Sequence, residues 1–133
     1  IENVDEITQG VSDQIREYYS DIEVSEYQII FHVYGKNAVM GRLEPHGEPG
    51  HELGILMEVV ASTQELASAI CATARSTMLH YPYEGRKSTA GNLAFPYSPS
   101  DIKCGPVYKF TIYHLVDVDD PCELFRTEYR TLR

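Results

Sequence analysis

A continuous apolar run leads directly into a helix start near the middle of the chain. Residues Gly54–Ala61, GILMEVVA, are nearly all apolar, which is typical of a strand that is central in its sheet. The following Ser62–Glu65 has the capping-box pattern that opens a helix, and Pro82 ends that helix. Small residues occur throughout its apolar face up to Met78. This pattern predicts a helix that lies flat on a sheet.

The residues before this strand and helix predict one more helix and one more strand. Val4–Tyr18 carries an apolar stripe at helical spacing, with Asn3 as the expected N-cap and Glu6 as its capping-box partner. Tyr27–Tyr34, YQIIFHVY, is rich in β-branched and aromatic residues and alternates as a strand does. Ala38–Met40 is a candidate for a short return strand. The order so far is helix, strand, strand, helix.

The longest predicted strand lies near the end of the chain. It covers Val107–Val118, VYKFTIYHLVDV, where Phe110 and Ile112 alternate with Tyr113. Residues Cys122–Leu132 fit either a short helix or an edge strand.

Together these elements predict a single α+β domain over residues 1–133, with both helices on one face of an antiparallel sheet. A strand before Asn3 would complete the βαββαβ order of a ferredoxin-like, split βαβ fold. The chain lacks that strand or substitutes it, either with its C-terminal segment or with another subunit. Since the first residue is Ile1 rather than Met, we expect the chain to be part of a longer protein.

The net charge limits the classes of partner that we expect. The chain has 20 acidic and 11 basic residues and a net charge of −9, so we expect no nucleic-acid or membrane partner. No apolar run is long enough to span a bilayer and no secretory signal is present, so we expect a cytoplasmic location.

The three cysteines, Cys71, Cys104 and Cys122, form no CxxC pair. They predict reduced thiols, with a disulfide between two of them as the alternative.

The segment Ser88–Pro106 combines three prolines and two glycines with large apolar side chains. It cannot form one uninterrupted helix or central strand. We expect Leu93, Phe95 and Ile102 to insert into the core or into an interface, because a solvated loop gains nothing from such residues. Asp101 is expected to cap or turn the backbone through its carboxylate.

Tyrosine is unusually frequent, with ten in the chain. Tyrosine combines an apolar face with a polar tip, which suits interfaces. Phe95, Tyr97, Tyr83 and Asp101 are therefore the candidate interface residues around this loop. A loop packed on its own sheet is the alternative.

The basic residues near the same loop predict an anion site. Arg86, Lys87 and Ser88 stand together, and Arg75 and Asn92 could join them around a phosphate or carboxylate. The alternative is a turn with two solvated bases.

Metal binding and self-sufficient catalysis find little support. His46 and His51 lie among glutamates in EPHGEPGHE, but glycine and proline place them on a loop without fixed ligand geometry, so we expect no metal and no cofactor. Ser98 lacks a GxSxG setting, and no base can be assigned to Cys104. The catalytic residues, if any exist, are unknown.

Three blocks of the sequence resemble the C-terminal part of the acyclic terpene utilisation (AtuA-like) family. They are HELGILMEVVASTQELASAICATARSTMLHYPYEGR, STAGNLAFPYSPSDIKCGPVYKF and YHLVDVDDPCELF, with AGNLAFPYSPSDI as the most specific part. The resemblance implies a longer parent protein with an N-terminal domain and a C-terminal domain of ferredoxin-like fold. The family's namesake belongs to pathways that degrade acyclic terpenes through acyl-CoA intermediates. The resemblance implies no catalytic residue here.

Two hypotheses follow. The first is an accessory domain that mediates domain or subunit association, with the parent's N-terminal domain and further copies of itself as partners. The second is part of an active site for a carboxylate or acyl-CoA, completed by the N-terminal domain. In the second, the five anion-site residues would bind the substrate and Ser98 or Asp101 would transfer a proton.

Overall fold

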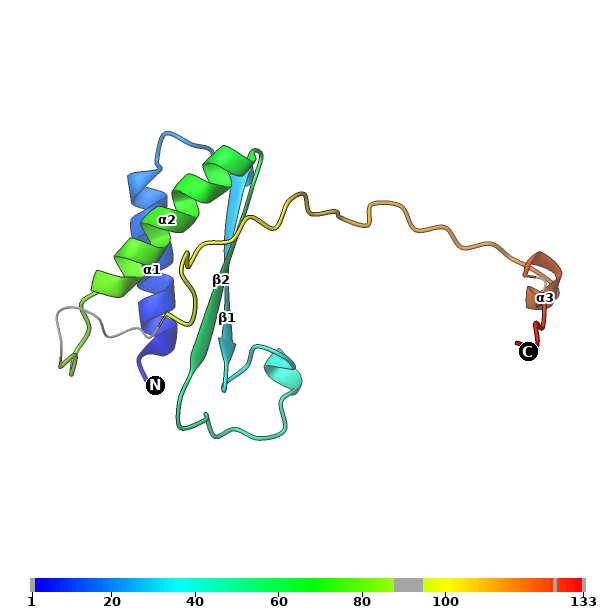
Figure 1. Ribbon diagram of the computed structural model, residues 1–133, viewed down its shortest axis with the longest axis horizontal. Helices are drawn as coiled ribbons and strands as arrows, with labels where there is room; N and C mark the ends of the chain where they lie inside the picture. Colours follow the sequence, from blue (N-terminus) through cyan, green and yellow to red (C-terminus); the bar gives the residue numbers. More distant parts are fainter. Residues whose placement is uncertain (1, 88–94, 126, 133) are drawn as a thin grey trace.

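The computed structural model describes residues 2–87, 95–125 and 127–132 (Figure 1). Helices α1 (Val4–Tyr18) and α2 (Gln64–His80) pack on a two-stranded antiparallel sheet of β1 (Tyr27–Tyr34) and β2 (Gly54–Ala61). The short helical segments are η1 (Val24–Glu26), η2 (Gly41–Leu43) and α3 (Pro121–Leu124). The predicted α+β class is confirmed. Within the described ranges, no helix has the length and apolar character needed to cross a membrane.

Both long helices begin where the sequence predicts, but their caps differ from the prediction. Thr63, not Ser62, is the N-cap of α2, and its Oγ1 accepts a hydrogen bond from Leu66 N at 3.1 Å. Ser62 instead donates to Glu26 across the start of the sheet, at 2.8 Å. The predicted capping box is therefore not formed: the N-cap lies one residue later, and the residue at the third helical position is Leu66, which cannot return a hydrogen bond.

The N-cap predicted for α1 is wrong in its chemistry. Asn3 precedes the helix, but its side chain makes no capping bond and donates to the Glu84 carbonyl at 3.3 Å. Asp5 and Glu6 lie in the first turn, where negative charge favours a helix N-terminus. The helix thus starts without a capping box and is attached to the segment after α2.

The sheet register places apolar pairs under the helices. Ile29 lies opposite Val59, and Phe31 lies opposite Met57, so these four side chains share one face. That face packs on a cluster of fully or almost fully buried residues from both helices and β1, namely Val11, Ile15, Tyr27, Ile70 and Ala74. Both helices therefore cover the same face, as the sequence predicts.

Helices α1 and α2 and the residue after α2 contact each other through one pair of hydroxyl groups and at one glycine. Tyr19 Oη and Thr73 Oγ1 are 3.0 Å apart and join the end of α1 to α2. Gly10 lies beneath Tyr81, and a Cβ at Gly10 would overlap the Tyr81 phenol. Glycine has a low helix propensity, but at position 10 it leaves room for the Tyr81 ring to pack on the backbone of α1.

The strand predicted at Val107–Val118 is not formed. The described residues of this segment are extended and exposed and have no neighbouring strand. Strand propensity alone does not hold a strand, because its backbone groups need a pairing partner.

Two smaller predictions are resolved by local geometry. Ala38–Met40 is a turn instead of a return strand, since Gly41 N donates to Asn37 O at 3.2 Å. Of the two alternatives for Cys122–Leu132, the structure has the short helix α3, in which Asp120 accepts from Cys122 N at 2.9 Å.

Candidate interaction surface

A cluster of Arg75, Ser100 and Asp101, here the Arg75 cluster, attaches the C-terminal third of the chain to α2. Arg75 Nη1 donates to Ser100 Oγ at 2.7 Å and lies 3.5 Å from Asp101 Oδ2. Ser100 Oγ also donates to Asp101 Oδ1 at 3.3 Å. The Asp101 carboxylate thus contacts side chains, whereas the sequence predicted contacts with backbone amides. All three residues are partly buried.

The Arg75 cluster lies on the side of α2 that faces away from α1. Thr73 faces α1 through its contact with Tyr19. Successive helix residues are rotated by about 100°, so Arg75 lies about 200° around the helix from Thr73. The chain therefore leaves the folded body on the outer side of α2.

The same contacts affect Cys71, which precedes Arg75 by one helical turn. Burial raises the pKa of the Cys71 thiol above its ordinary value of 9.0, and the Asp101 carboxylate raises it further, while Arg75 opposes this change. Cys71 is partly buried, and Cys104 and Cys122 are exposed free thiols. The predicted reduced state agrees with these free cysteines.

Arg86, a predicted anion ligand, holds the end of α2. Its guanidinium donates to the carbonyl oxygens of Leu79 at 2.7 Å and Tyr81 at 2.6 Å, and it lies 5.9 Å from the centre of the Tyr83 ring. A cation near the last carbonyls of a helix is favourable for the helix dipole. Lys87 is exposed.

The described residues of the predicted anion site therefore do not form one site, because they contact different groups of this chain. Arg75 contacts Ser100 and Asp101, and Arg86 contacts helix carbonyls. Ser88 and Asn92 lie outside the described residues. The anion site stays a prediction.

The loop side chains are not part of the core of this chain. Phe95 is 45% exposed and Ile102 is 70% exposed, so their predicted insertion into the core is wrong. Leu93 lies outside the described residues. Tyr97 and Tyr83 are also exposed. The role of these residues in an interface stays a prediction.

After the Arg75 cluster, the chain extends far from the folded body as the segment Ile102–Val118, here called the arm (Figure 1). Its even-numbered positions from Tyr108 to Val118 are apolar except for His114, whereas its odd-numbered positions are mixed: Lys109, Thr111 and Asp117 occur together with Tyr113 and Leu115. The apolar side chains are open to solvent, with Tyr108 91% and Phe110 82% exposed. Contiguous exposed apolar surface of this kind marks interaction sites in soluble proteins.

The sheet is exposed at its edges and on one face. Each strand has one neighbour, so the outer edges of β1 and β2 are unpaired among the described residues. On the face away from the helices, His32 Nε2 lies 2.7 Å from Glu58 Oε2, and Leu56 is exposed. Unpaired edges of this kind can bind another strand.

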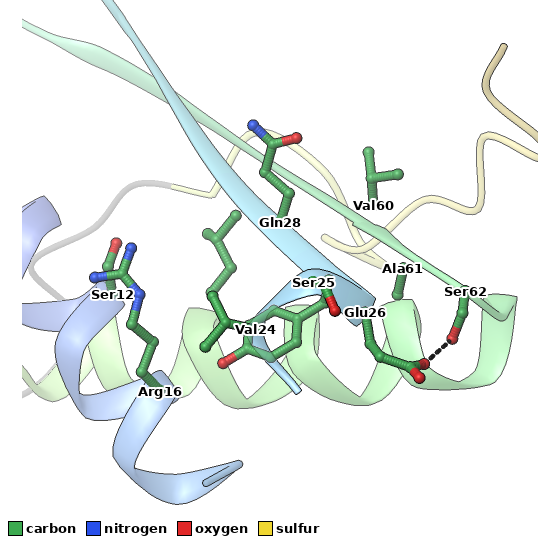
Figure 2. Close-up of a pocket in the computed structure, with 11 residues that line it drawn as sticks. Ser12, Arg16, Val24, Ser25, Glu26, Gln28, Val60, Ala61 and Ser62 are labelled. Atoms are coloured by element: carbon green, nitrogen blue, oxygen red, sulfur yellow. Dashed lines mark hydrogen bonds between the residues drawn. The ribbon is translucent and has the colours of Figure 1, made fainter. Parts of the chain in front are cut away.

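An open hollow of about 770 Å³ lies where α1 approaches the start of β1 (Figure 2). Its charged side chains already have partners: Arg16 contacts Asp13 at 2.9 Å, and Glu26 accepts from Ser62. Tyr27 also lines it, but the Tyr27 hydroxyl is buried and lacks a hydrogen-bond partner in the structure. The hollow places no unpaired charge toward a ligand.

Among the residues that the structure describes, the other candidate chemical groups are not gathered into one site. His46 and His51 are exposed on the loop before β2, and the described residues contain no group of three or more potential metal ligands. Cys104 Sγ donates to the Ile102 carbonyl at 3.8 Å, and Ser98 is exposed. No described contact activates either nucleophile.

Comparisons of the chain with protein-family models, with curated proteins and with solved structures found no match. The resemblance to the AtuA-like family therefore stays a prediction.

Proposed function

We propose that this chain is an association domain, in which the arm carries the contact with a further protein surface. The observation that carries the proposal is the combination of an exposed, alternating apolar segment with a firm attachment at the Arg75 cluster. A segment attached in this way presents its side chains to a partner without disturbing the folded body.

The incomplete sheet supports the same function. The order α1, β1, β2, α2 is the central part of a ferredoxin-like, split βαβ fold, which has further strands beside the equivalent of β2. In this proposal, the association supplies strand pairing at an edge of the sheet. The AtuA-like resemblance would make another domain of the parent protein, or another subunit, the source of that pairing.

The rival function, a shared active site for a carboxylate or acyl-CoA, has no specific observation in its favour. The described contacts of Arg75 and Arg86 are with groups of this chain. We therefore keep association as the proposed function.

The test compares charge placed on the two faces of the arm. Phe110→Asp/Ile112→Asp alters the apolar face, and the matched control Thr111→Asp/Tyr113→Asp adds the same charge to the other face. In extracts of cells that make the tagged chain, size-exclusion chromatography should place the parent and the control well above the 15.1 kDa of one chain. The apolar-face variant should elute as a monomer with an unchanged melting temperature. If all three elute as monomers, the proposed function is wrong.

A further inference from the structure

We infer that the partner of the arm is a second copy of this chain: each arm adds to the unpaired outer edge of β2 in the other copy. This inference rests on the proposed association function and names its partner. Among the described residues, neither the arm nor the outer edge of β2 pairs with another strand, and the arm extends away from its own sheet (Figure 1). Two copies in this conformation fill both vacancies at once by a two-fold exchange, which is a common route to symmetric dimers.

The position of the Arg75 cluster indicates the edge. Residues of α1 line one hollow with both strands, with Gln28 of β1 and Val60 of β2 among them, so α1 lies near both strands. Helix α2 packs on β2, and Arg75 points away from α1. The arm therefore begins beside the outer edge of β2, where a strand added to that edge would be covered by α2.

The alternation of the arm matches the two faces of this sheet. An added strand with Tyr108, Phe110 and Ile112 toward the helices would continue the apolar layer formed by Met57 and its neighbours. The odd-numbered residues would then lie on the open face. There, Lys109 shares a face with Glu58, whose side chain is 53% exposed.

Charge favours the same pairing. The stretch 102–116 contains two lysines and no acidic residue, whereas the whole chain has a net charge of −9. This basic stretch of the arm is therefore attracted by the acidic remainder of a second copy.

The area is sufficient for a stable dimer. Each arm would bury two large aromatic residues, Tyr108 and Phe110, together with Ile112, and a buried aromatic residue contributes roughly 150–250 Å². Two arms, together with the aliphatic side chains and the edges that they cover, exceed the roughly 1,000 Å² expected of a specific interface.

Crosslinking of the purified full chain tests the exchange. Glu58→Cys and Lys109→Cys are combined in a Cys104→Ser/Cys122→Ser background and treated with a short bismaleimide. Light scattering should give twice the 15.1 kDa chain mass, and denaturing gels should show crosslinked dimers. The matched control replaces Lys109→Cys with Phe110→Cys, which places the second thiol on the opposite face and should give little crosslinked dimer.

Two results would overturn the inference. A monomer with an intramolecular crosslink would mean that the arm closes on its own sheet. A dimer in which Lys109→Cys forms no crosslink with Glu58→Cys, nor with Leu56→Cys or Val60→Cys in its place, would mean that another surface associates. The proposed association function can be distinguished from the exchange between two copies. If the purified chain is a monomer but elutes from cell extracts in an arm-dependent complex with another protein, association stands and exchange does not.

Discussion

Arg75 and Ser100, 25 residues apart in the sequence, are joined by a 2.7 Å hydrogen bond that fixes the point where the chain leaves its folded body. The contact lies between helix α2 and a segment with no regular secondary structure. It separates a region organised by helix and sheet packing from an extended, exposed arm.

Arg75→Ala should release this attachment with little loss of global stability. The Arg75 and Asp101 side chains are 39% and 34% exposed, and partly solvated ion pairs contribute little to stability. Trypsin should cleave after Lys103 several times faster in the variant, whereas cleavage after the exposed Lys109 should be unchanged. Equal acceleration at both sites would mean that Arg75 does not fix the base of the arm.

Ile70→Ala should strongly destabilise the chain, because Ile70 is completely buried between the helices and the sheet. Core substitutions of this kind typically cost about 2–5 kcal/mol. Phe95→Ala is the control and should change the free energy of unfolding of the monomer by less than about 0.5 kcal/mol, the range of surface changes. Urea unfolding at low protein concentration measures both. A large loss for Phe95→Ala would show that the loop packs on the body after all.

Gly10→Ala should destabilise α1, although alanine is favoured over glycine in helices by about 1 kcal/mol. The added methyl group would overlap the Tyr81 ring, and overpacking of this kind typically costs about 1–3 kcal/mol. In a Tyr81→Ala background the same change should become stabilising. A double-mutant cycle from thermal unfolding tests the sign reversal. Stabilisation in both backgrounds would contradict the packing of Tyr81 on Gly10.

Cys71 should react with thiol reagents more slowly than the exposed Cys104 and Cys122, with a pH midpoint above 9.0. Burial and Asp101 raise the pKa of Cys71 and so reduce the thiolate fraction at a given pH. Asp101→Asn should therefore move the midpoint downward. Ser100→Ala loosens the same contact without removing the charge and should leave the midpoint in place. Equal shifts in both variants would indicate changed exposure instead of changed charge.

The predictable part of the fold is the part with local signals. Helical spacing and strand alternation predict α1, β1, β2 and α2, because each buries one periodic face. The caps at Asn3 and Ser62 were not predictable, since their side chains are used by Glu84 and Glu26, which are far away in the sequence. The strand propensity of Val107–Val118 does not indicate whether this segment has an unpaired strand edge to pair with.

The candidate surface was predicted only in part. The sequence placed Asp101, Phe95 and Tyr97 near an interface and Arg75 in an anion site, but it gave no signal that Arg75 would contact Ser100. The His32–Glu58 contact was missed because the two residues lie on different strands, and a register is needed to bring them together.

The sequence order of body and arm has a consequence during synthesis. The elements from α1 to α2 end at His80, and the arm ends 38 residues later, at Val118. At typical rates of about 5–20 residues per second, the body is therefore synthesised roughly 2–8 s before the end of the arm. In the exchange that we infer, the outer edge of β2 would be uncovered during that interval, so nascent chains on one messenger RNA would present unpaired edges to one another.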